Sequence, residues 1–372
     1  MCACDEALLT AQSSTSSNRK TLVVSMSSCG RCVRVLGLLA ISHIDFSFGT
    51  QEACGQATCD DLQENSLSLI QKSTKLVAKA SLHSGVTPHE SLYLDLVRDT
   101  LTGSVLNTPS VTAGEGEGES LRRGPYDEEL RLRGADWCDE CYTMAGGRRV
   151  QNVRELVEKT IGENVPGDFL EAGTWRGGCS IMARTVQRIM NEDENRRTYV
   201  CDSFSGLPPS SNKQDTDSWS RMHFLEVSQE EVEQNFKKFQ ALDSNVLFRK
   251  GFFSETLPII RQELMNQGRK LAVLRGDGDM YESYMDILYN LYQFVPVGGY
   301  FICDDCPTIA EAQRAIDDFR QHHGITAPIQ KVQDSKYGTY WRKEAGDMSI
   351  AVDYNWYVNW NATRAFKEKP SS

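Results

Sequence analysis

The most constraining feature of this 372-residue chain is a regular alternation of helix-like and strand-like segments from Val150 to about Lys343. Short apolar runs with strand character are separated by longer stretches with helical spacing. Such alternation predicts a mostly parallel β-sheet that is covered by helices on both faces. We therefore expect one α/β domain over residues 150–345.

Seven strands and six helices are expected in this domain. The strands are Asp168–Ala172, Thr198–Cys201, Val246–Lys250, Leu271–Arg275, Tyr300–Cys303, Ala327–Val332 and Gly338–Trp341. The helices are Val150–Ile161, Ser180–Met190, Gln229–Phe239, Pro258–Asn266, Tyr281–Tyr292 and Ile309–His322. Too few residues separate the last two strands for a helical crossover, so these strands should form an antiparallel hairpin. A seven-stranded, mostly parallel sheet with such a terminal hairpin is the Rossmann-like layout of class I methyltransferases, which is an argument from fold alone.

The remainder of the chain divides into three segments. Residues 1–88 lack sustained periodicity and are expected to form a largely disordered N-terminal extension. Its serine-rich, acid-free part, Ala7 to Ile44, resembles an organellar transit sequence, and transit sequence and simple disorder both stay open. Residues 89–149 are expected to form a helical lid, with a helix at Glu90–Thr102 and a linker at Thr112–Ser120. Residues 346–372 are expected to be a C-terminal tail.

Composition argues against several classes of partner. The net charge of −11 and the pI near 5.2 disfavour nucleic acid and anionic membrane surfaces, because binding to these needs clustered Lys and Arg. No apolar run reaches the roughly 18 residues of a membrane span. We expect a cytoplasmic protein, with organellar targeting left open. The three C-x-x-C pairs, Cys29/Cys32, Cys138/Cys141 and Cys303/Cys306, are expected to be free thiols. No histidine stands at zinc-ligand spacing, and Cys303 lies in a predicted strand whose residues point to alternate faces.

A glycine-rich turn follows the first strand of the domain, in the stretch from Phe169 to Gly178. Glycines there let the backbone approach a ligand closely, and the next helix offers unpaired N–H groups. Glu171 leads the turn where a dinucleotide site would have G-x-G-x-x-G, and an acidic residue suits the ammonium group of S-adenosylmethionine. The alternative is a turn that serves helix packing alone.

Two further strand ends carry candidate cofactor contacts. Asp202, at the end of the second strand, can accept hydrogen bonds from both ribose hydroxyls, or it caps a following turn. Gly251 and Phe252, after the third strand, are placed to contact the adenine, or the ring belongs to the core.

Carboxylates gather after the fourth and fifth strands. Asp277 follows one strand, and the pair Asp304 and Asp305 follows the other. Crowded ionised groups need a compensating cation, and all-oxygen ligation favours Mg²⁺ over zinc. Asp279 is a candidate general base, although Asp279 to Glu282 also matches a helix capping box. His223 is the second choice of base.

An ordered series of motifs resembles the macrocin O-methyltransferase family over about residues 90–345. The series comprises Leu92–Leu96, Trp137, Tyr142–Met144, Arg149, Asn152, Val165–Gly178, Asp202–Pro208, Val227-Ser228, Asn235-Phe236, Asp277–Ser283 and Asp304-Asp305. Members are enzymes that depend on Mg²⁺ and S-adenosylmethionine and methylate hydroxyls, typically on sugars of glycosylated natural products. Three residues depart from the family pattern: Cys138 for a proline, Gly276 for a leucine and Cys306 for a tyrosine.

The resemblance implies a role for each matching residue. Thr143 and Met144 would help to cover the cofactor. The methionine part would lie against Glu171, Ala172, Gly173, Thr174 and Trp175, the ribose against Asp202, Ser203, Phe204, Ser205 and Gly206, and the adenosine end against Gly251 and Phe252. The metal ligands would be Asp277, Asp304 and Asp305, with Asp279 as the base.

The sequence therefore predicts an S-adenosylmethionine-dependent O-methyltransferase that acts on a hydroxyl of a sugar-containing or polyhydroxylated small molecule. Two alternatives stay open: an inactive cofactor-binding relative that serves as an interaction subunit, and a catechol-type O-methyltransferase. Acceptor choice is expected to reside near Trp137–Met144 and Ser210–Phe224. A homo-oligomer is compatible with the resemblance.

Overall fold

The computed structural model of the protein describes residues 86–113, 121–216, 218–346 and 351–365, together with the backbone of three N-terminal strands. The chain divides into two compact units, Met1–Leu76 and Val77–Ser372. The first unit contains β1 (Glu6–Ala11), β2 (Leu22–Cys29) and β3 (Cys32–Val33), which pair antiparallel in that order. These strands lie in the extension that was expected to have low order, and the rest of it up to residue 85 lies outside the described residues. The transit-sequence hypothesis stays a prediction.

The second unit is built on the predicted seven-stranded sheet, with strand order β11-β12-β10-β9-β6-β7-β8. Its strands are β6 (Asp168–Ala172), β7 (Thr198–Asp202), β8 (Val246–Lys250), β9 (Leu271–Gly276), β10 (Tyr300–Cys303), β11 (Gln330–Lys331) and β12 (Thr339–Arg342). The first five are parallel, whereas β12 pairs antiparallel with β10 and with β11. The class I methyltransferase fold and its terminal hairpin are confirmed, although β11 is shorter than predicted.

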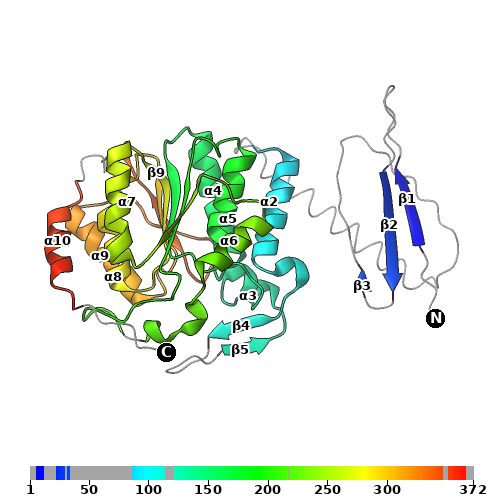
Figure 1. Ribbon diagram of the computed structural model, residues 1–372, viewed down its shortest axis with the longest axis horizontal. Helices are drawn as coiled ribbons and strands as arrows, with labels where there is room; N and C mark the ends of the chain where they lie inside the picture. The colour runs from blue at the N-terminus through cyan, green and yellow to red at the C-terminus, as the bar shows by residue number, and fades with distance from the viewer. Residues whose placement is uncertain are drawn as a thin grey trace. The chain divides into compact units, whose positions relative to one another are not determined.

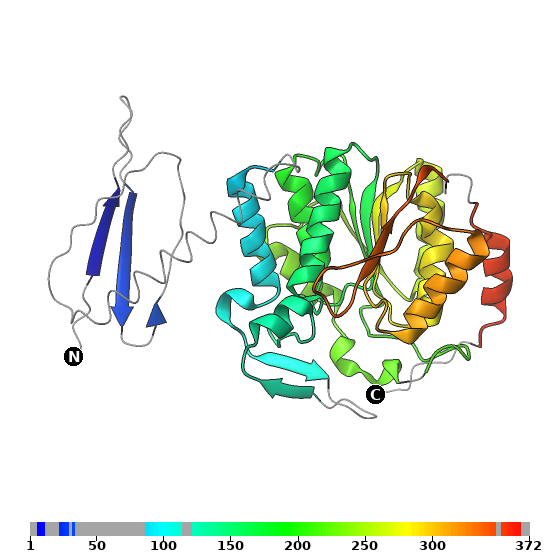
Figure 2. The same cartoon turned by 180° about the vertical axis from the view of Figure 1, so that it is seen from behind.

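Helices cover both faces of this sheet (Figures 1 and 2). One face carries α2 (Pro88–Leu101), α4 (Gly146–Gly162), α5 (Gly178–Ile189) and α6 (Gln229–Lys238). The other carries α7 (Phe253–Gln267), α8 (Tyr281–Leu291), α9 (Ala310–His323) and α10 (Tyr354–Ala362). Each face has its own apolar core, and α8 is buried along its whole length. Among the described residues, no helix is long and apolar enough to cross a membrane.

Two helices of the domain begin clearly earlier than predicted, and one of them is α4, which begins at Gly146 and not at Val150. Helix α7 begins at Phe253, before the predicted start at Pro258, which lies inside the helix. Helix α2 has a narrow buried face, because Leu92 and Leu96 are 45% and 54% exposed. Its buried side consists of Leu94, Val97 and Leu101 with Ser91.

The predicted lid, residues 89–149, begins with α2, and the rest of it lies between α2 and α4. This part contains a short hairpin of β4 (Ser110–Ala113) and β5 (Leu121–Gly124), which pair at the two ends of the predicted linker. Residues 114–120 are outside the described residues. Helix α3 (Glu128–Arg133) follows the hairpin, and short 3₁₀ turns lie at Ser104–Leu106, Trp219–Arg221, His223–Leu225 and Tyr292–Phe294. The buried Arg131 donates to Asp136 and to the Thr102 carbonyl oxygen (2.7 Å), which holds the lid to the end of α2.

The expectation of free thiols is wrong for two of the three C-x-x-C pairs. Cys138–Cys141 and Cys303–Cys306 are disulfides, with Cα–Cα distances of 5.0 and 5.5 Å that lie within the range such bonds span. Strand alternation was taken to separate Cys303 from Cys306, but β10 ends at Cys303 and the chain turns there. The side chains of Cys29 and Cys32 lie outside the described residues.

Candidate active site

The carboxyl ends of β6, β7, β9 and β10 meet at one edge of the sheet, where a cavity of about 840 Å³ opens. Open α/β sheets bind ligands at this edge. The cavity brings together most of the predicted site residues: Thr143, Met144, Glu171, Gly173, Thr174, Trp175, Asp202, Ser203, Gly206, Phe252, Asp277, Asp279, Asp304 and Asp305. The other predicted contacts, Ala172, Phe204, Ser205 and Gly251, are not among the described lining residues.

The glycine-rich turn packs directly on the backbone of the acidic turn. Gly173 has φ of +91°, a conformation that favours glycine, and a Cβ atom there would stand 1.6 Å from the Asp277 carbonyl oxygen. The Asp277 N–H in turn donates to the Ala172 carbonyl oxygen at 2.8 Å. Gly173 therefore lets the cofactor turn and the acidic turn lie against each other.

Glu171 is buried and fully engaged by its own chain. It accepts hydrogen bonds from the Ser180 N–H at 3.1 Å, from the Ser180 hydroxyl and from the Thr174 hydroxyl at 3.2 Å, and it is paired with Arg275. Burial raises the pKa of Glu171, an effect opposed by Arg275. Its predicted contact with the ammonium group stays a prediction.

Asp202 joins the ends of β6 and β7. Its carboxylate accepts from the Thr174 N–H at 2.8 Å and the Trp175 N–H at 3.3 Å, and also from the Phe204 N–H at 2.9 Å. The bond from the Phe204 N–H closes a local turn, which agrees with the alternative prediction that Asp202 caps a following turn. Asp202 still lines the cavity, so its ribose contact stays a prediction.

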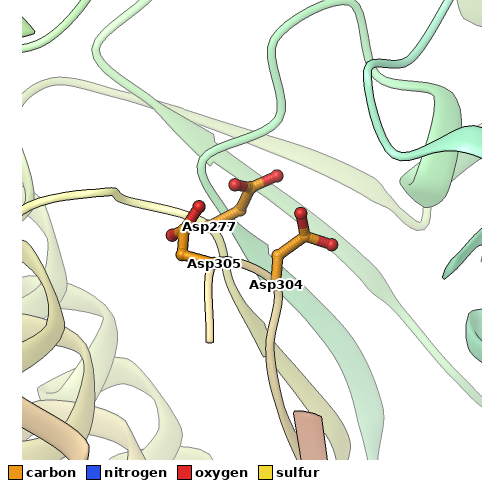
Figure 3. A group of neighbouring side chains, drawn as sticks. All are labelled: Asp277, Asp304 and Asp305. Atoms are coloured by element: carbon orange, nitrogen blue, oxygen red, sulfur yellow. The ribbon is translucent and has the colours of Figure 1, made fainter. Parts of the chain in front are cut away.

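Three carboxylates meet beyond the ends of β9 and β10 (Figure 3). Asp277, Asp304 and Asp305 each offer an oxygen, and these oxygens all lie within 4.8 Å of one another. A set of three carboxylates fits an oxygen-coordinated divalent cation such as Mg²⁺.

Two buried arginines that sequence reasoning assigned no role lie within this cluster. Arg275 is paired with Asp304 and, at 2.9 Å, with Asp277, while Arg149 is paired with Asp304 from helix α4. One signal was present in the sequence, because Arg275 is the one charged residue of an otherwise uncharged strand and needs a buried counter-charge. Arg149 belongs to the family motif, but nothing in its spacing placed it here.

The cluster carries more negative charge than its two arginines compensate. Burial raises the pKa of Asp277 well above its usual value, and Asp304 raises it further. Burial and the neighbouring Asp305 likewise raise the pKa of Asp279 well above the usual range, and the pKa of Asp305 is raised by burial and Asp304. An added divalent cation would remove this penalty on the ionised forms.

Asp279 is held at the cluster by its backbone. Its φ is +55°, and its N–H donates to an Asp305 oxygen at 3.0 Å. The capping-box interpretation is wrong, because α8 is capped from a distance by Asp215, which accepts from the N–H groups of Tyr281 (2.6 Å) and Glu282 (3.0 Å). Sequence spacing missed this partner, which lies 66 residues before Tyr281.

Two of the departures from the family pattern lie beside the acidic cluster. Gly276 leaves room for the ring of Tyr284, which lies 3.0 Å from where a Cβ would stand. The Tyr284 hydroxyl lies 2.8 Å from both the Gly276 carbonyl oxygen and an Asp305 oxygen. Gly276 therefore admits a group that holds Asp305. Cys306 is joined to Cys303, so this disulfide brackets the acidic pair.

His223 does not belong to the site. Its ring lies on the surface, where Nδ1 is 2.9 Å from Glu226, and it is not among the described cavity-lining residues.

The fold is that of class I methyltransferases, and a carboxylate cluster lies at the sheet edge where this fold binds ligands. These features define the protein as a class I methyltransferase. The profile of the macrocin O-methyltransferase (TylF) family matches residues 90–343. The chain belongs to this family of O-methyltransferases.

Curated relatives lie over the same part of the chain. The demethyldecarbamoylnovobiocin O-methyltransferase of Streptomyces niveus is 39% identical over 258 residues, which is 68% of this chain and 94% of that protein. The mycinamicin III 3''-O-methyltransferase of Micromonospora griseorubida is 33% identical over 261 residues, 68% of this chain and 97% of the relative. Among solved structures, that of the O-methyltransferase NovP superposes on this chain with a TM-score of 0.60 and 38% sequence identity. The match covers 68% of this chain and 99% of the NovP chain.

Proposed function

We propose that this O-methyltransferase transfers the methyl group of S-adenosylmethionine to a hydroxyl of a sugar-containing or polyhydroxylated small molecule, with Mg²⁺ at Asp277, Asp304 and Asp305. The observation that carries the proposal is a cavity that contains both the glycine turn after β6 and the acidic cluster. The names of two relatives, a mycinamicin 3''-O-methyltransferase and a rhamnosyl-tetracenomycin 4'-O-methyltransferase, support a glycoside acceptor.

The cofactor would lie along the ends of β6, β7 and β8. Gly173 and Trp175 line the cavity beside Glu171, where the methionine part would bind, and Asp202 and Ser203 line it where the ribose would bind. Phe252 stands at the start of α7 and offers its ring to the adenine. Thr143 and Met144 would cover the cofactor from the lid.

The acidic residues divide into metal ligands and a base. Bound at Asp277, Asp304 and Asp305, Mg²⁺ would lower the pKa of an acceptor hydroxyl and favour its ionised form. Tyr284 holds the Asp305 carboxylate, and Arg275 holds both Asp277 and Asp304, so the three side chains are oriented before any ligand arrives.

Asp279 is the residue that would accept the hydroxyl proton. It lines the cavity, its N–H is bonded to Asp305, and it lies two residues beyond Asp277. A carboxyl group whose pKa is raised by burial is a stronger base than an exposed aspartate once it is ionised.

Part of the cavity lining is aromatic. Trp137 of the lid stacks on Phe224 with ring centroids 5.8 Å apart, and the Trp175 indole N–H donates to the Phe224 carbonyl oxygen at 3.0 Å. These rings line the cavity together with Trp219 and Tyr337. A cavity lined by both aromatic rings and carboxylates suits an acceptor that has both an apolar face and hydroxyl groups.

The test is mass spectrometry of acceptors incubated with the protein, isotope-labelled S-adenosylmethionine and Mg²⁺. The acceptors would be demethyldecarbamoylnovobiocin and mycinamicin III, the compounds in the names of two relatives, with simple catechols as a separate arm. The proposal expects the gain of one labelled methyl on a sugar hydroxyl. Methylation of catechols alone would contradict the acceptor class, and binding of S-adenosylmethionine without transfer to any acceptor would support an inactive relative.

A further inference from the structure

The C-terminal segment that the sequence marked as a simple tail forms part of the cavity wall. Helix α10 and Arg364 lie beyond residue 343, where the family match ends, and both Asn361 and Arg364 line the cavity. Asp353 caps the helix by accepting from the Trp356 N–H at 3.0 Å. Trp356 stacks on Tyr289 of α8 with ring centroids 5.0 Å apart, so the segment is packed onto the domain.

Arg364 supplies the positive charge for two buried carboxylates of α8. Its side chain is 4% exposed, and its guanidinium lies 2.7 Å from Asp286 and 3.2 Å from Glu282. These carboxylates stand one turn apart on the same face of the helix, where two like charges repel each other. The planar guanidinium can bridge both of them at once.

The same arginine also holds the loop that follows the predicted ribose contact. Its Nε donates to the Ser211 hydroxyl at 2.9 Å, and the Ala365 N–H donates to the Ser211 carbonyl oxygen at 3.3 Å. Glu282 accepts from the Ser211 N–H at 3.1 Å and from the Asn212 side chain at 2.9 Å. The loop is thereby tied to the start of α8, which directly follows the turn that carries Asp279.

This loop, residues 207–216, is part of the cavity wall. Leu207, Pro208 and Pro209 line the cavity, and Asp215 caps α8 from the far end of the loop. The loop overlaps the region around Ser210–Phe224 in which acceptor choice was expected to reside. Arg364 and Ala365 both contact this loop at Ser211.

We propose that residues 353–365 are a clamp that fixes loop 207–216 against α8, and that Arg364 is the positioning residue through which this C-terminal segment sets one wall of the acceptor pocket. The assignment of that wall to the acceptor rests on the proposed function. The fixing of the loop does not, because it follows from contacts within the chain alone.

Hydrogen exchange on the full-length protein tests the clamp without any acceptor. Arg364→Ala is compared with the control Val358→Ala. Val358 lies on α10 and is 48% exposed. In Arg364→Ala we expect the amides of residues 207–216 to exchange about tenfold faster, with β6, β9 and β10 unchanged. Unchanged protection of the loop in a folded Arg364→Ala protein would overturn the proposal, and so would a uniform rise across the whole sheet.

A second variant keeps the test decisive if Arg364→Ala does not fold. The combined change Arg364→Met, Glu282→Gln and Asp286→Asn removes all three charges, and replacing a complete buried ion group in this way is often tolerated. We expect this protein to fold and to show the same loss of protection in the loop. Arg364→Lys should restore protection only in part, because an ammonium group cannot bridge two carboxylates as a guanidinium does.

Kinetics then separate the clamp from the proposed reaction. Once an acceptor is found, Arg364→Ala should raise the KM for the acceptor about tenfold or broaden the acceptor range, while the affinity for S-adenosylhomocysteine stays within about twofold. Faster exchange in the loop without any change in acceptor kinetics would overturn the acceptor-wall assignment. Absence of turnover on every acceptor would count against the proposed function and leave the exchange result intact.

Discussion

Two buried acid–arginine clusters in this protein differ in how their negative charge is compensated. The sheet edge holds five carboxylates, those of Glu171, Asp277, Asp279, Asp304 and Asp305. Arg149 is paired with Asp304, and Arg275 is paired with Glu171, Asp277 and Asp304. On α8, the two carboxylates of Glu282 and Asp286 share Arg364.

The carboxylates on α8 are also satisfied by neutral donors. Ser211, Asn212 and the Tyr357 hydroxyl all bond to them. The sheet-edge carboxylates also accept hydrogen bonds from neutral donors such as the Tyr284 hydroxyl, and both groups line the same cavity. The groups differ in charge, because five carboxylates beside two guanidinium groups leave a larger negative excess than two carboxylates beside one, and the sheet-edge carboxylates raise one another's pKa. This difference distinguishes the α8 group, which is a structural ion group, from the sheet-edge cluster, which is arranged for a cation. It also shows that a buried arginine beside carboxylates does not by itself identify either one.

The largest effect is expected for Asp279→Asn. If Asp279 accepts the hydroxyl proton, kcat should fall by about 10²–10⁴, because that is the usual contribution of a positioned base. Binding of S-adenosylmethionine and thermal stability should stay close to those of the parent protein. Asp317→Asn, on the exposed side of α9, is the matched control. Full activity in Asp279→Asn would remove this residue from the mechanism.

A change in the backbone between the two turns should have the next largest effect. Gly173→Ala places a Cβ atom 1.6 Å from the Asp277 carbonyl oxygen, so the cofactor turn and the metal turn have to separate. We expect a loss of about 2–4 kcal/mol in the free energy of unfolding and loss of S-adenosylhomocysteine binding. Chemical denaturation and calorimetry measure the two effects. Gly268→Ala is the control for the backbone strain of a positive φ, because Gly268 also has a positive φ but a Cβ added there meets open space.

The pH dependence of stability should distinguish the two clusters. Burial raises the pKa of Asp286 from 3.8 to about 6, so its protonated form is favoured in the folded state. A raised folded pKa contributes stability that is complete below the unfolded value and is lost as pH rises through the folded value. Without metal, the protein should therefore lose on the order of 3 kcal/mol through Asp286 between about pH 4 and pH 6.

Asp286→Asn should flatten that part of the profile, because the amide does not titrate. The sheet-edge carboxylates, whose pKa values are raised as well, should continue the decline at higher pH. Added Mg²⁺ should remove only this second decline. Thermal melts across pH, with and without Mg²⁺, measure both parts, and a profile that Mg²⁺ leaves unchanged would show that the two clusters are alike.

Much of the fold and of the sheet-edge site could be predicted because the signals are local. Asp277 and Asp304 directly follow apolar strands, and parallel strands end at one edge, so their proximity follows from topology. The glycine turn after Glu171 was visible for the same reason.

Contacts between residues far apart in the chain could not be predicted. Asp215 caps α8 from 66 residues before Tyr281, and Arg364 reaches Glu282 from a segment without any motif. The Cys303–Cys306 disulfide was missed because strand alternation was extended past the end of β10 to Cys306, three residues beyond Cys303, where it no longer holds.

The central claim is that the sheet-edge carboxylates bind a divalent cation. Calorimetric titration of Mg²⁺ into the protein saturated with S-adenosylhomocysteine tests it directly, with Asp305→Asn as the ligand variant and Asp286→Asn as the variant in the other cluster. We predict one Mg²⁺ per chain in the parent protein and in Asp286→Asn, and binding at least tenfold weaker in Asp305→Asn. Equal Mg²⁺ affinity in Asp305→Asn and the parent protein would contradict the account.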